Sequence, residues 1–338
     1  MPVYTYALQA GVLMTSMFEH TQSPVCVHIL HDEMLTADNR RRFSKTAEKF
    51  NQKVQLIDVT DLFSKVNQNG EIDKIAKHLT RGTFFRLLIP DLIDAEKAIC
   101  LDCDIVVNLD IAELWNIDLS APDVSLAAAA DEAIATNLSK IERMRFNAWG
   151  LEYGKYFNAG VLVMNLKRIR QKHENLLGGA RVFHECYGSL VMYAEQDFLN
   201  VTFKDDVLFI DGRFNRLTML SLYEGHAKDI EGVIIHFAGL KPWVFLKNSA
   251  SDNLYWETFA RSEWNDQLRE QLFGALKNLC HDGECRCKYH RGSECARRVT
   301  RRLLSRFCLV FTRSLPAWFR LCGIYLSKLR RKPGGETI

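Results

Sequence analysis

Helix-patterned and strand-patterned segments alternate along this chain, and that alternation restricts its fold more than any other feature. Helical periodicity marks residues 11–20 and 39–50, and strand patterns cover 25–30, 54–59, 124–131, 159–166, 207–211 and 232–239. Such alternation predicts an α/β domain with a mixed, mostly parallel sheet. Ligands of these folds bind at the carboxyl ends of the strands, where several of these segments carry polar residues.

Size and composition exclude several classes of protein. The 338 residues are 47% hydrophobic and 25% charged, which is typical of a globular protein with one large domain or two ordinary ones. The chain does not begin with a basic segment followed by an apolar one, and it lacks an uncharged apolar run of about 18 residues. We therefore expect a cytoplasmic protein without a membrane-spanning helix.

The segment KAICLDCDIVVNLD, residues 97–110, places two aspartates inside an apolar strand pattern. Unpaired carboxylates are costly there, so something positive is expected beside Asp102 and Asp104. Residues two apart in a strand project from the same face, which would let both carboxylates bind one cation while Cys103 points away. Oxygen ligands of this kind suit Mg²⁺ or Mn²⁺.

Two enzyme classes use a D-x-D segment of this type. A phosphatase of the haloacid dehalogenase type uses the first aspartate as nucleophile beside a magnesium ion. That class usually carries the motif near the chain start with a loop straight after it, whereas here the strand pattern continues from Asp104 to Val107. A nucleotide-sugar glycosyltransferase uses both carboxylates to hold a divalent ion that bridges the donor's diphosphate. Two acids at a strand end would be the non-functional interpretation.

Cysteine usage is uneven along the chain. Four cysteines, Cys26, Cys100, Cys103 and Cys186, are scattered and fit the reduced thiols of a cytosolic protein. The others lie from Cys280 onward, where the cluster Cys280, His281, Cys285, Cys287, His290 and Cys295 raises the question of a zinc site. The spacing is not the paired C-x-x-C pattern of a typical zinc site, so a loop with free thiols is the alternative.

Seven sequence blocks, taken in order, resemble glycosyltransferase family 8, the retaining enzymes that include bacterial lipopolysaccharide galactosyl- and glucosyltransferases. The blocks are TFFRLLIPDLI (83–93), LDCDIVVNLDIAELWNIDL (101–119), AAAD (128–131), YFNAGVLVMNLKRIR (156–170), EQDFLNVTF (195–203), RFN (213–215) and IIHFAGLKPW (234–243). A lone D-x-D is a weak signal, whereas seven blocks in family order across residues 4–265 are a specific one. The resemblance implies a GT-A fold.

The resemblance also implies a metal and donor site. It makes Asp102, Asp104 and His236 the metal ligands, and this mixed oxygen and imidazole set favours Mn²⁺ over Mg²⁺. Gly239 and Lys241 would approach the donor's diphosphate, glycine by permitting close backbone contact and lysine by its charge. The donor sugar would be surrounded by Arg86, Asp131, Asn158, Gly160, Glu195, Gln196 and Asp197.

The family transfers sugar with retention of configuration. It presents a glutamine, here Gln196, near the anomeric carbon, and a poor nucleophile disfavours a stable glycosyl-enzyme. We expect front-face substitution through an oxocarbenium-like state, with the departing UDP stabilised by the metal and Lys241 and taking up the acceptor's proton. Asp131 is the alternative nucleophile.

The start of the chain departs from the family pattern. Family members begin with a strand and an acidic-acidic-Asn-Tyr run that grips uridine, whereas here a helix pattern follows almost at once. Tyr4 or Tyr6 would stack on uracil, and no acid precedes either. We expect the first strand to be missing from the sheet, which would leave two sheet edges unpaired.

The C-terminal segment is strongly basic. Eleven Lys or Arg residues and no acid lie between Ala296 and Lys332. One helical face would carry Val299, Leu303, Phe307, Val310 and Phe311. Such a helix could lie on an anionic membrane surface, or pack on the catalytic body; no nucleic-acid-binding motif accompanies the charge. We expect a catalytic domain at 1–265, a cysteine-containing connector at 266–295 and a basic amphipathic tail at 296–338.

Together these features predict a hexosyltransferase at the inner face of a membrane. It would use UDP-glucose or UDP-galactose and act on a glycan or glycolipid such as lipopolysaccharide. The alternatives are a dehalogenase-type phosphatase and an inactive remnant that binds nucleotide sugars.

Overall fold

The computed structural model describes residues 6–67, 70, 72, 81–135, 139–218, 230–246 and 249–281. Contacts divide the chain into two units, Met1–Leu276 and Lys277–Ile338, and the fold described below is that of the first. The predicted basic tail, and the connector's cysteines and histidines beyond His281, lie outside the described residues. Within the described residues, no helix combines the length and apolar character needed to cross a membrane.

The N-terminal part alternates helices and strands as predicted. It runs through α1 (Ala7–His20), β1 (Cys26–His31), α2 (Ala37–Lys49), β2 (Lys53–Asp58) and α3 (Thr60–Val66). Strands β1 and β2 are parallel. Helix α2 begins where the Thr36 side chain accepts a hydrogen bond from the Asn39 N–H, which satisfies one of the free donors of the first turn.

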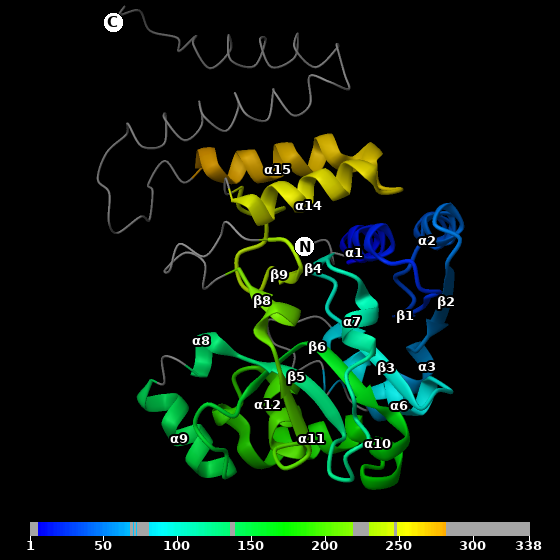
Figure 1. Ribbon diagram of the computed structural model, residues 1–338. Coiled ribbons are helices and arrows are strands. Elements are labelled where there is room, and N and C mark those ends of the chain that lie inside the picture. Colours follow the sequence, from blue (N-terminus) through cyan, green and yellow to red (C-terminus); the bar gives the residue numbers. More distant parts are fainter. Residues whose placement is uncertain are drawn as a thin grey trace, which may run out of the picture. The chain divides into compact units, whose positions relative to one another are not determined.

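A four-stranded sheet forms the centre of the unit (Figure 1). Its order is β3 (Lys97–Leu101), β6 (Phe157–Asn165), β5 (Leu126–Ala130) and β7 (Val207–Ile210). Strand β6 is antiparallel to both neighbours, and β5 and β7 are parallel. Every residue of β6 but the last is buried, because helix α12 (Ala194–Thr202) packs on it and α11 (Leu176–Tyr187) packs on α12.

A third, three-stranded sheet follows the order β4 (Ile105–Asn108), β9 (Val233–His236) and β8 (Arg216–Leu217). Strands β4 and β9 are antiparallel, and β8 and β9 are parallel. The mixed α/β class is therefore confirmed. Among the described strands, parallel and antiparallel pairings are equally common, because β6 and β9 each run against a neighbour.

The prediction that one strand continues through the two aspartates is wrong. The apolar run breaks after Leu101 and resumes at Ile105, so β3 and β4 are separate strands in separate sheets. The physical reason is that each strand finds a different antiparallel partner, β6 for one and β9 for the other. Asp102–Asp104 form the crossing between the sheets.

The absence of the family's first strand stays a prediction, because residues 1–5 lie outside the described residues. Within the part of the chain that the structure describes, β1 pairs only with β2, and β4 pairs only with β9. Helix α1 packs against β4, and the Ser16 hydroxyl accepts a hydrogen bond from the Val107 N–H at 3.0 Å. A side chain thus satisfies a backbone donor of β4 that its ladder leaves free.

The remaining helical segments lie between these strands or follow them in the chain. They are α5 (Gly82–Phe85), η2 (Arg86–Leu88), α6 (Ile89–Leu92), α7 (Ile111–Trp115), α8 (Glu132–Ala135), α9 (Lys140–Trp149), α10 (Leu166–Lys172), η3 (Gly188–Leu190), η4 (Gly212–Asn215), α14 (Ala250–Arg261), η5 (Asn265–Gln267) and α15 (Leu268–His281). Trp264, just before η5, is fully buried, and its ring lies 5.0 Å from that of Phe43 on α2.

Gly11 in α1 is required by the packing of Trp264. A Cβ at this position would overlap the six-membered ring of Trp264. We therefore expect Gly11→Ala to lower the free energy of unfolding by about 1–3 kcal/mol. This loss should occur although alanine is favoured over glycine in a helix by about 1 kcal/mol.

Gly274 on α15 is the matched control, because an added Cβ there meets nothing within 4 Å. Gly274→Ala should leave stability unchanged or raise it by up to about 1 kcal/mol. Urea unfolding of the two variants and the parent protein measures both effects. Equal changes in the two variants would contradict the packing argument.

Candidate metal and donor site

The two aspartates meet because the chain changes sheets between them. The Asp102 N–H donates to the Gly160 carbonyl on β6 at 2.8 Å, and the Phe237 N–H after β9 donates to the Asp104 carbonyl at 2.9 Å. The crossing is thus hydrogen-bonded to both sheets. This arrangement, rather than the alternation of one strand, brings the carboxylates together.

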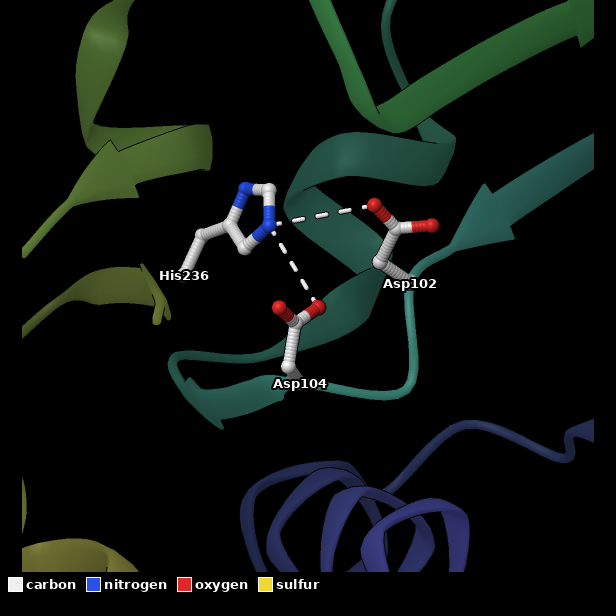
Figure 2. A group of neighbouring side chains, drawn as sticks. All are labelled: Asp102, Asp104 and His236. Atoms are coloured by element: carbon white, nitrogen blue, oxygen red, sulfur yellow. Dashed lines mark ion pairs between the residues drawn. The ribbon is translucent and has the colours of Figure 1, made fainter. Parts of the chain in front are cut away.

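His236, the last residue of β9, completes a three-residue cluster with these carboxylates (Figure 2). Its Nε2 lies 3.8 Å from Asp102 Oδ2 and 3.4 Å from Asp104 Oδ1. One ligand atom from each residue falls within 4.8 Å of the other two. The structure therefore brings together the three residues predicted as metal ligands.

The ring of His236 is held in the orientation a metal ligand needs. The ring is buried, and its Nδ1 lies 2.9 Å from Asn215 Oδ1, a carbonyl oxygen that accepts a hydrogen bond. Asn215 Nδ2 in turn donates to Asn158 Oδ1, which fixes the direction of the Asn215 amide. Nδ1 therefore carries a proton, and Nε2 faces the carboxylates, as is usual for metal-binding histidines.

Gly160 is needed for this placement. A Cβ there would lie 2.3 Å from His236 Cε1 and 2.6 Å from His236 Nδ1, closer than real side chains come. Gly160, which was predicted to face the donor sugar, therefore leaves the space that the imidazole ring of His236 fills.

Each carboxylate has one oxygen atom that does not face His236, and a cationic side chain forms an ion pair with that oxygen. Arg86 forms an ion pair with Asp102 Oδ1, and Lys241 forms one with Asp104 Oδ2. Burial alone would raise the pKa of Asp104, but the charges of His236 and Lys241 outweigh it and hold that pKa well below its usual value. These are the positive partners that the sequence called for beside the two acids.

The same charges act on His236. Burial alone would lower the pKa of His236, and the carboxylate of Asp104 outweighs burial and raises it. Since Asn215 accepts the proton on Nδ1, a divalent cation at Nε2 would take the place of the second ring proton.

A second group of polar side chains surrounds Asp131, at the carboxyl end of β5. Asp131 Oδ2 accepts hydrogen bonds from Asn158 Nδ2 at 3.0 Å and from Gln196 Nε2 at 3.1 Å. The Gln196 Oε1 accepts the Ala159 N–H at 3.0 Å. Three residues predicted to contact the donor sugar therefore lie in direct contact with one another, directly after β5, on β6 and on α12.

Arg86 joins this group to the metal cluster. Its side chain reaches Asp102, the Ala159 carbonyl, and Glu195 Oε1 at 3.5 Å. Burial raises the pKa of Glu195 to about 7, and the nearby Arg86 opposes this rise. The other carboxylate oxygen of Glu195, Oε2, is buried and has no hydrogen-bond partner among the described residues. An unsatisfied oxygen of this kind is available to a ligand hydroxyl.

The remaining predicted residues are placed as follows. Tyr6, directly before α1, is 37% exposed. Burial, then the charge of Asp104, raises the pKa of Tyr6, so the ring lies near the metal cluster. Gly239 has φ +86°, a left-handed backbone that favours glycine, and the neighbouring Lys241 donates to the Phe237 carbonyl at 2.8 Å.

Asp197 differs from the other predicted sugar contacts. It is fully buried, and its oxygens accept hydrogen bonds from Arg145, Tyr156 and two backbone N–H groups. It therefore lies behind Gln196, where its hydrogen-bonding capacity is taken up by the protein.

Sequence reasoning missed three residues of this site. Asn215 belongs to the recognised block 213–215, but no role was assigned to it. The only indication of a role was that this block follows a strand, β7, where ligand-binding residues are expected. Tyr156 opens a recognised block without a predicted role, and Arg145 carries no signal in the sequence because its partner Asp197 is distant in the chain. The cysteine and histidine cluster considered as a zinc site lies outside the described residues, apart from the backbone of Cys280 and His281.

Known proteins resemble this chain in sequence and in fold. A putative glycosyltransferase of Haemophilus influenzae is 30% identical over 211 residues, which are 62% of this chain and 60% of that protein's length. General stress protein A of Bacillus subtilis is 25% identical over 280 residues, 77% of this chain and 91% of that protein.

Solved structures share the fold. The galactosyltransferase LgtC in complex with donor and acceptor sugar analogs has a TM-score of 0.64 at 24% identity, covering 78% of this chain and 96% of that one. The structure of the glycosyltransferase GlyE of Streptococcus pneumoniae has a TM-score of 0.53 at 22% identity and covers 81% of this chain and 62% of that one.

The GT-A fold predicted from the sequence is confirmed by these structures. The family model of glycosyl transferase family 8 matches residues 4–247, most of the described chain. The chain belongs to glycosyl transferase family 8.

Proposed function

We propose that this chain is a retaining hexosyltransferase that moves glucose or galactose from a UDP-sugar to a glycan acceptor, with Mn²⁺ or, less suited to its ligands, Mg²⁺ as cofactor. One observation supports this proposal most strongly. Arg86 contacts both the three-residue metal cluster and the group of polar side chains around Asp131. A metal beside a sugar pocket is what a nucleotide-sugar donor needs.

The donor set fits a divalent ion. Asp102 and Asp104 offer oxygen and His236 offers nitrogen, all within 4.8 Å, and Asn215 leaves Nε2 free to bind. A mixed set of this kind favours Mn²⁺ over Mg²⁺. When bound, the ion would neutralise the donor's diphosphate and act as a Lewis acid toward the leaving UDP.

The chain's own residues have separate tasks in this proposal. Lys241 adds a positive charge for the diphosphate, and the left-handed turn at Gly239 lets the backbone approach it. Glu195, Asn158 and Arg86 face the sugar hydroxyls, where polar groups fixed in place discriminate between hexoses. Tyr6 would stack on the uracil ring.

Retention is explained best by front-face substitution. The Gln196 amide carbonyl is already hydrogen-bonded to a backbone N–H, and an amide is a poor nucleophile. Asp131 is the alternative nucleophile; Oδ2 accepts two side-chain donors and Oδ1 the Ile134 N–H at 3.3 Å, which stabilise the carboxylate as an anion beside a developing positive sugar.

The acceptor is proposed to be a glycan or glycolipid such as lipopolysaccharide, reached at the cytoplasmic face of a membrane to which the basic tail would attach. The eleven basic residues of 296–332 support this location, and they lie outside the described residues. Family membership argues against the dehalogenase-type phosphatase. An inactive nucleotide-sugar-binding protein is the remaining alternative, which activity measurements distinguish.

The first prediction concerns the metal cluster. UDP and Mn²⁺ together should raise the melting temperature, because a ligand present at 100 times its Kd adds about 2.7 kcal/mol to stability. Asp104→Asn should abolish that shift, while Asp123→Asn, at an exposed position, should retain it. A folded parent protein with no shift, or an undiminished shift in Asp104→Asn, would refute the assigned donor site.

The second prediction concerns the mechanism. NMR of the first product formed should show the anomeric configuration of the donor. Mass spectrometry of enzyme quenched during turnover of a 2-fluoro donor, which slows the breakdown of any glycosyl-enzyme, should show the unmodified protein mass. A hexose attached to Asp131 would establish the double-displacement route in place of the front-face one.

The third prediction concerns Glu195. Its pKa is about 7 in the folded protein against an ordinary 4.5, so the folded state holds a proton that the unfolded state has lost in this interval. The free energy of unfolding should therefore fall as pH rises from 4.5 to about 7. Glu195→Gln should reduce this slope, as measured by urea unfolding across the pH range. Glu152→Gln, whose side chain is 70% exposed, should keep the parent's slope.

A further inference from the structure

A buried ion pair lies behind the sugar site, away from the metal cluster. Arg145 on α9 and Asp197 on α12 are both fully shielded from solvent, and Arg145 Nη2 donates to Asp197 Oδ1 at 2.5 Å. Buried pairs of this kind are weak sources of stability, because desolvation offsets their attraction. Their hydrogen-bond partners are therefore the better guide to their role.

Arg145 is held from several directions. Its Nε donates to the Leu190 carbonyl at 2.8 Å. Its guanidinium lies 4.8 Å from the centre of the Trp149 ring and 5.2 Å from that of Tyr193. These contacts hold the guanidinium beside Asp197, to which it is a positive partner.

Asp197 ties the start of α12 together. Its Oδ2 accepts the N–H groups of Met192 and Tyr193 at 2.8 and 2.9 Å. Ala194, between this turn and the catalytic region, has the left-handed φ of +44°, which an alanine adopts only when surrounding contacts impose it. Asp197 thereby fixes the backbone from which Gln196 projects.

Tyr156 connects Asp197 to Gln196. The Tyr156 hydroxyl lies 2.6 Å from Asp197 Oδ1, and Gln196 Nε2 lies 3.3 Å from the same hydroxyl. Burial, followed by the charge of Asp197, raises the pKa of Tyr156, so the hydroxyl keeps its proton. A carboxylate can only accept, so that proton points to Asp197 and the hydroxyl oxygen is left to accept from Gln196.

The amide of Gln196 has one orientation compatible with all these partners. Ala159 offers an N–H and requires the carbonyl oxygen, while Asp131 and Tyr156 offer acceptors and require the NH₂ group. Turning the amide over would break three hydrogen bonds and set its oxygen against the Asp131 carboxylate.

We propose that Tyr156, held by the Arg145–Asp197 pair, is a positioning residue that keeps the NH₂ group of Gln196 directed at Asp131 and its carbonyl away from it. The proposal rests on the proposed sugar transfer for its consequence in catalysis. Its geometric content, the fixed amide, stands by itself. Tyr156 and Arg145 act through Gln196 and need no contact with the sugar.

NMR of the ligand-free protein labelled only at glutamine tests the geometry without any catalytic assay. The Gln196 side-chain signal is identified by its absence from Gln196→Ala. In Tyr156→Phe we expect this signal to shift and its protons to exchange with water about tenfold faster, as one of their two acceptors is lost. The control is Tyr153→Phe, which removes an exposed hydroxyl bonded to Asn147 at 2.8 Å and should leave the signal unchanged. An unchanged signal in Tyr156→Phe overturns the proposal.

Kinetics then test the consequence. Tyr156→Phe should lower kcat for hexose transfer about tenfold or more with KM for the donor unchanged, since a misdirected group affects the reacting geometry more than binding. In a Gln196→Ala background the same substitution should have no further effect on kcat. A full additional loss in that background would show a general structural role and overturn the positioning role. If the parent protein transfers no hexose, the proposed function is wrong. The NMR experiment still tests whether Tyr156 fixes the orientation of the Gln196 amide.

Discussion

The crossing of the chain between two sheets at Asp102–Asp104 is the constraint on which the rest of the site depends. Each strand of the interrupted run has its own antiparallel partner, and these partners, β6 and β9, place Gly160 and His236 beside the crossing and in contact with each other. The hydrogen bonds from the Asp102 N–H to Gly160 and from the Phe237 N–H to Asp104 fix its ends. A continuous strand would have kept both carboxylates on one sheet and could not have brought them to His236.

Charge compensation follows from that placement. Asp102 and Asp104 are partly shielded from water, where an unpaired carboxylate is unfavourable, and each has one cationic side chain beside it, Arg86 or Lys241. The other oxygen of each faces His236 Nε2. The same two cations would also meet the anionic diphosphate of the proposed donor, so the pairing that offsets the two carboxylates is compatible with the proposed function.

The sequence predicted the parts of this site that are local or repeated in a family, and missed those that depend on tertiary contact. The alternation of strand and helix patterns was enough for the α/β class, and the ordered blocks were enough to name Asp102, Asp104 and His236. The sheet change was not predictable, because the apolar pattern on both sides of the aspartates is equally compatible with one strand. Arg145 resembles any helical arginine until the fold places Asp197 beside it.

A single chain of hydrogen bonds joins the metal cluster to that buried pair. It passes in order through His236, Asn215, Asn158, Asp131, Gln196, Tyr156, Asp197 and Arg145. In each of its side-chain amides, the oxygen accepts a hydrogen bond from a neighbouring side chain or backbone N–H, and the NH₂ group donates to an acceptor. The neighbours therefore determine the orientation of every amide. Because buried amides lose more by an unmet partner than they gain from a met one, the whole chain favours one arrangement. The ligand geometry at His236 and the amide direction at Gln196 are therefore set by the same network.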